Sequence, residues 1–176
     1  MEIQIKKSWL DNRHPTYKNQ ERWWKLYLDS YQGGWQWAEG DYLYKHPKES
    51  DEDFKARKKR ANRCNYTKQV LDLLISYLWK SGPTRKEPPG ALKHFWDNCD
   101  RQGTKINDFM RSASTMAGIF GSYYIVIDKP PQVANNQQEE IENKLFPYAY
   151  GVSPSDMLDI QYDGNGFVTE ALVREW

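Results

Sequence analysis

The chain has 176 residues and a net charge of only +1, with 8 tryptophans and 12 tyrosines. That length is enough for one domain with its own core or for a piece of a larger domain, and its large amphipathic side chains often meet partners. No apolar run approaches the roughly 20 residues of a membrane span, and no signal peptide opens the chain, so we expect no membrane partner.

The first helix is predicted to begin at His14-Pro15-Thr16 and to end at Gly33-Gly34. Its apolar face is formed by residues at i, i+3, i+4 and i+7 spacing, namely Trp24, Tyr27, Leu28 and Tyr31. Trp35 and Trp37 follow in a predicted loop. Their rings either fold onto the preceding helix or form a binding platform.

A polar, charged helix is predicted to begin at Ser50, because Asp53 three positions on completes a capping pattern. Acidic residues at 51–53 suit the positive end of the helix dipole. Five cations of this helix and its end are candidate contacts to a neighbouring subunit or to DNA phosphates: Lys55, Lys58, Lys59, Arg60 and Arg63. A solvated basic face is the remaining interpretation.

A second, apolar helix follows, with Thr67 as its predicted N-cap and Gly82-Pro83 beyond its end. Between Val70 and Leu78 the apolar residues occupy more than one helical face. We therefore expect this helix to be largely buried, so that Leu74→Ala would cost roughly 2 to 5 kcal/mol.

Two more helices are predicted, a short one at Ala91–Trp96 and a longer one at about Asn107–Phe120. Tyr123–Asp128 has the aromatic and β-branched residues of a strand. The polar insert at 132–143 is either a loop or a short surface helix.

Further strands are predicted at 145–150, 157–162 and 167–176, and the last two flank a strong hairpin turn at 163–166. The fold class is therefore α+β, with N-terminal helices followed by a mostly antiparallel sheet. We divide the chain into an arm and first helix (1–41), a helical region (42–121) and a β region (122–176). The last strand has no turn or polar tail after it, so we expect the natural protein to continue beyond Trp176 or the gene product to be truncated.

No pattern of residues predicts a catalytic or cofactor site. The candidate metal ligands His46, Cys64, His94 and Cys99 match no zinc spacing, and neither cysteine lies in a CxxC pair, which is typical of free thiols in a reducing compartment. The 163–166 turn lacks the later acidic ligand of a calcium loop. Nucleotide-binding and hydrolase motifs are also missing, so we expect no enzyme, no cofactor and no metal.

Several short patterns, in their order and spacing from Pro15 to Trp176, resemble the N-terminal region of tailed-bacteriophage portal proteins. They are Tyr42-Leu43, Lys45-His46-Pro47, Lys59-Arg60-Ala61, then Asn65, Thr67, Val70 and Asp72, the step from Phe120 to Pro130, Pro147-Tyr148, and Ser153 to Asp156.

The resemblance implies a structural subunit of a portal, or head-tail connector, with a wing-like fold. Such a subunit forms a homo-oligomeric ring, usually a dodecamer, at one capsid vertex in the virion, after assembly in the bacterial host cytoplasm. The terminase motor drives double-stranded DNA through the ring without reading its sequence, and the major capsid protein and a head-tail adaptor are the other implied partners. The family's stem and clip would follow Trp176.

The charge is divided unevenly along the chain. Residues 1–100 carry 19 Lys and Arg against 14 Asp and Glu, whereas residues 101–176 carry 6 against 10. We therefore expect head-to-tail contacts, with the basic helix beside the acidic stretch 139–142 of a neighbour. Two alternatives stay open: a small phage adaptor or scaffold-like interaction protein, and a phage hydrolase with a Cys/His site.

Overall fold

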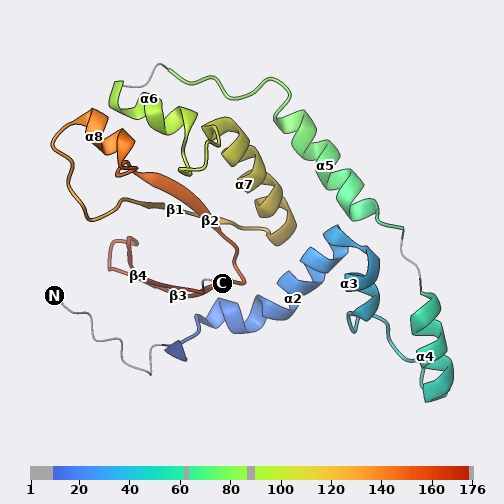
Figure 1. Ribbon diagram of the computed structural model, residues 1–176. Coiled ribbons are helices and arrows are strands. Elements are labelled where there is room, and N and C mark those ends of the chain that lie inside the picture. The colour runs from blue at the N-terminus through green and yellow to red at the C-terminus, as the bar shows by residue number, and fades with distance from the viewer. Residues whose placement is uncertain (1–9, 62–63, 87–89, 175–176) are drawn as a thin grey trace. The chain divides into compact units, whose positions relative to one another are not determined.

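The computed structural model describes residues 10–61, 64–86 and 90–174. Most helices precede the strands, and the strands form antiparallel pairs, so the fold is mixed α+β as expected (Figure 1). The chain divides into two compact units, residues 1–72 with 155–176 and residues 73–154. The division predicted from the sequence, into 1–41, 42–121 and 122–176, differs from these two units and stays a prediction.

In the first unit, helix α2 (Pro15–Gln32) begins and ends where the sequence predicted. The His14 Nδ1 atom accepts a hydrogen bond from the amide of Thr16 at 3.2 Å, and Gly33 closes the helix with a φ of 67°. That conformation favours glycine and reverses the chain at once. Helix α3 (Gly34–Glu39) therefore starts immediately, and the predicted loop around Trp35 and Trp37 was wrong.

The polar helix α4 (Asp51–Arg60) is capped as predicted, because the Ser50 Oγ atom accepts from the amide of Asp53 at 3.1 Å. Helix α5 (Tyr66–Leu78) starts two residues earlier than predicted. Its cap is Asn65, whose Oδ1 atom accepts from the amide of Lys68 at 3.1 Å, and not Thr67. Asn65 also donates to the carbonyl of Tyr31 at 2.8 Å, so a tertiary contact selects it as the cap.

The expectation that α5 is largely buried was wrong. Of the residues from Val70 to Leu78, only Ile75 is buried, at 9% exposed. The helix is apolar on two sides, and the described residues cover only one of them. Periodicity alone could not reveal this, because an apolar stripe has the same spacing whether its partner lies in the same chain or outside it.

The last two strands complete the first unit. Strands β3 (Met157–Tyr162) and β4 (Val168–Val173) form an antiparallel hairpin, as predicted. In the turn, the Asp163 Oδ1 atom accepts from the amides of Asn165 and Phe167, at 2.9 and 2.8 Å. The hairpin is tied to the start of α2, where the amide of His14 donates to the carbonyl of Leu158 at 3.0 Å.

The boundary between the units lies within α5, so the second unit begins with its residues 73–78. It also contains α6 (Gly90–Asp97), α7 (Ile106–Phe120), β1 (Tyr124–Asp128), α8 (Gln137–Glu142) and β2 (Tyr148–Val152). Of the two alternatives for the polar insert, the short helix is the one found. Strand β2 pairs with β1 from Tyr148 to Val152, later than the predicted 145–150. Pro147, which cannot donate to a ladder, immediately precedes the strand. The described strands thus form two separate two-stranded sheets and not one.

Candidate functional site

The basic helix α4 carries the cations that the sequence singled out. Lys55, Lys59 and Arg60 are exposed. Lys58 lies 3.6 Å from a carboxylate oxygen of Asp41. Arg63 falls outside the described residues. Four of the five predicted contact residues therefore lie on or beside one short helix, and at least one of them already has an acidic neighbour in its own chain.

Another cation of α4, Arg57, is engaged more tightly. Its Nε and Nη2 atoms donate to the two carboxylate oxygens of Glu49, each at 2.8 Å, and Nη2 also donates to the carbonyl of Tyr44 at 2.7 Å. The hydrogen bonds from Arg57 lower the pKa of Glu49 to about 2. A guanidinium that donates two hydrogen bonds to one carboxylate forms a strong ion pair. The positive charge of Arg57 therefore serves to hold the preceding loop on the helix.

Helix α5 carries a row of large apolar side chains that lie in water. We call this row the outward stripe; its exposed fractions run from 55% to 70%, and its members are Val70, Leu73, Leu74, Tyr77 and Leu78. Ile75 lies on a different side of the helix and is buried. The spacing of the outward stripe is i, i+3, i+4, i+7 and i+8, which is the pattern of a helix that lies against a partner.

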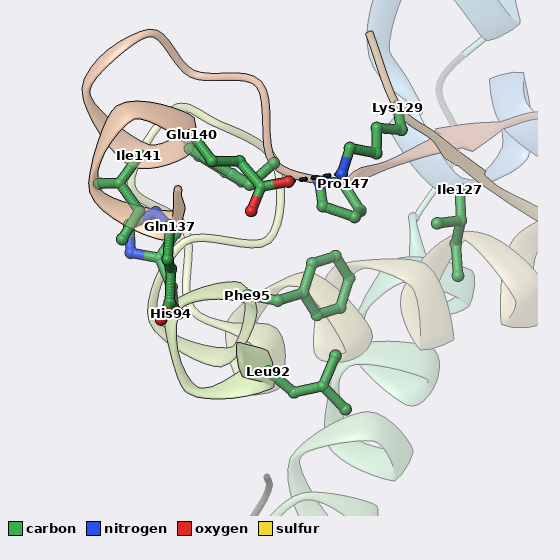
Figure 2. A pocket seen from close by; sticks show the side chains of 10 residues that line it. Leu92, His94, Phe95, Ile127, Lys129, Gln137, Glu140, Ile141 and Pro147 are labelled. Carbon is green, nitrogen blue, oxygen red and sulfur yellow. Dashed lines mark hydrogen bonds and ion pairs between the residues drawn. The ribbon is translucent and has the colours of Figure 1, made fainter. Parts of the chain in front are cut away.

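The second unit has a cavity of about 470 Å³, within the size range of ligand pockets. We call it the α6–α8 pocket; its mainly apolar walls include Leu92, Phe95, Ile127, Ile141, Phe146 and Pro147. Figure 2 shows Leu92 and Phe95 of α6, Ile127 of β1 and Ile141 of α8 around this pocket. At one side the Lys129 Nζ atom and the Glu140 Oε1 atom form an ion pair at 2.5 Å.

The pocket also includes His94, one of the candidate metal ligands. Its ring stands edge-on to that of Phe146, with the centroids 4.4 Å apart. Its Nε2 atom is buried and has no hydrogen-bond partner among the described residues. No group of three potential metal ligands converges in the part of the chain that the structure describes. His94 therefore acts here mainly as an aromatic wall of the pocket.

The two cysteines lie in different surroundings. Cys64 is exposed, whereas Cys99 is fully buried. The Cys99 Sγ atom donates to the carbonyl of Thr104 at 3.3 Å, and burial raises the pKa of its thiol. An activated nucleophile needs the opposite, a lowered pKa beside a cation or an imidazole.

Sequence reasoning missed the α6–α8 pocket. Its walls come from segments between positions 92 and 147, and no local pattern joins them. The residues of the outward stripe were recognised as apolar from the sequence, but they were predicted to be core.

Among the described helices none is both long and apolar enough to cross a membrane. Comparison with known protein families and with curated proteins finds no match to this chain.

Proposed function

We propose that this chain is the N-terminal part of a tailed-phage portal subunit, a structural protein that assembles into a ring at one capsid vertex. In this role it serves as a conduit for double-stranded DNA and an attachment point for the tail. It carries out no chemistry itself. Its partners are further copies of the chain, the major capsid protein, the terminase motor and a head-tail adaptor.

The observation that carries the proposal is the outward stripe of α5. Five large apolar side chains on one helix face, each at least 55% exposed, are unusual for a protein that works alone. Such a surface is typical of a subunit that becomes covered on assembly. The resemblance of the sequence to portal proteins then supplies the kind of assembly.

A small adaptor or scaffold-like protein is the second candidate, because the same stripe could bind a different protein. The two candidates differ in self-assembly, since an adaptor would form a defined complex with its partner and no ring of its own. The hydrolase alternative has less support, because the buried thiol of Cys99 lacks the surroundings of a nucleophile.

The proposal is tested by finding the chain in the virion. A peptide tag on the natural full-length protein, placed in the exposed 163–166 turn and imaged with a gold-labelled antibody in disrupted particles, should mark one capsid vertex. A tag distributed over the capsid, or missing from virions, would contradict the portal assignment. A tag found only in complex with one other protein, outside any ring, would favour the adaptor.

A further inference from the structure

We propose that the outward stripe of α5 in one copy inserts into the α6–α8 pocket of the neighbouring copy. The inference rests on the proposed function, because it takes the partner to be a second identical chain. It names the two surfaces that would meet at each junction of the ring.

The two surfaces have complementary form. An amphipathic helix that docks into an apolar groove does so through anchors at i, i+3, i+4 and i+7, and Val70, Leu73, Leu74 and Tyr77 have that spacing. The pocket is a hollow of about 470 Å³ with mainly apolar walls. Its rim is apolar as well, since Ile127 is 67% exposed and Leu92 is 49% exposed.

Their charges are complementary too. Lys80 is exposed just beyond the last residue of the stripe, Leu78, and has no ion pair with a described residue. Helix α8 beside the pocket is acidic, and its Glu142 is exposed and likewise unpaired by any described cation.

The symmetry of a ring requires two different surfaces on each subunit. A head-to-tail contact joins one patch of a chain to a different patch of the next, whereas a two-fold dimer joins a patch to itself. This chain carries one apolar surface that projects, on α5, and one that is hollow, bounded by α6 and α8. The pair supplies the two different surfaces of a head-to-tail contact, which forms a ring when the rotation from one copy to the next closes the circle.

Cross-linking between two differently tagged full-length proteins tests the contact. Both carry Cys64→Ser, which removes the exposed thiol, while the buried Cys99 stays. One protein carries Leu74→Cys on the stripe and the other Ile141→Cys in the pocket wall. The matched control replaces Leu74→Cys by Ser76→Cys, an exposed position on the opposite side of α5. A short bismaleimide is added to the mixed assembly.

The proposal predicts a doubly tagged chain dimer from the 74 and 141 pair, at least tenfold above the 76 and 141 control. Rings that form without this product would overturn the inference and leave the proposed function standing. Dimers linking position 74 to position 74 would also overturn it. A further protein carries both Leu74→Cys and Ile141→Cys, and a 74–141 link formed within its single chains would overturn the inference as well. If the Cys64→Ser protein forms no rings at all, the proposed function fails as well.

Discussion

The two sides of α5 predict losses of stability of different size from the same kind of substitution. Ile75 is 9% exposed, so Ile75→Ala should lower the free energy of unfolding by about 2 to 5 kcal/mol, through lost transfer energy and the cavity left behind. Leu74 is 59% exposed, so about two-fifths of its surface is buried. Because full burial of a leucine contributes about 1.5–3 kcal/mol, Leu74→Ala should cost only about 1 kcal/mol.

The assay is guanidinium denaturation of dilute, unassembled protein, followed by circular dichroism. Both residues lie on one helix, and both substitutions end in alanine, so the difference in helix propensity is small. Equal losses for the two variants, or a larger loss for Leu74→Ala, would refute the assignment of an inner and an outer side to α5. In the assembled protein the order should change, since Leu74→Ala would then weaken the ring.

Two further predictions concern thiols and pH. Cys64 should react with a maleimide at pH 7 in the folded protein, whereas Cys99 should react only after unfolding, because it is buried and the pKa of its thiol is raised. Mass spectrometry of labelled peptides checks this. Labelling of Cys99 in the folded protein would contradict the structure. Folding lowers the pKa of Glu49 from its ordinary value of 4.5 to about 2. The pairing of Glu49 with Arg57 therefore stabilises the folded protein fully at pH values above 4.5, and this stabilisation is lost as the pH falls toward 2. Arg57→Gln should move that pKa up toward 4.5 in an NMR titration, and an unchanged pKa would show that the pair is absent.

Local signals in the sequence were enough for most of the secondary structure. Caps such as Ser50, breakers such as Gly33 and the 163–166 turn act within a few residues, so their effects could be read without knowledge of the fold. The exceptions are tertiary. Asn65 replaces Thr67 as a cap because it also bonds to Tyr31, a residue more than thirty positions away.

The candidate site was less accessible to sequence reasoning. The α6–α8 pocket joins Leu92 to Pro147 across several elements, and only the folded chain brings such positions together. The apolar pattern of α5 was visible, but a pattern gives the direction of an apolar face and not the identity of what covers it. The resemblance to portal proteins rests on the order of short patterns along the sequence. An α+β fold class does not test that resemblance.

Electron microscopy of the purified natural full-length protein at micromolar concentration is the most direct measurement of the central claim. If the chain belongs to a portal subunit, the protein should form closed rings of uniform copy number, and Leu74→Glu on the outward stripe should release monomers that keep the circular dichroism of the folded chain. Ser76→Glu, on the other side of the same helix, should leave the rings intact. Monodisperse monomers of the unsubstituted protein would contradict the portal assignment, whereas rings unaffected by Leu74→Glu would contradict the role given to the outward stripe.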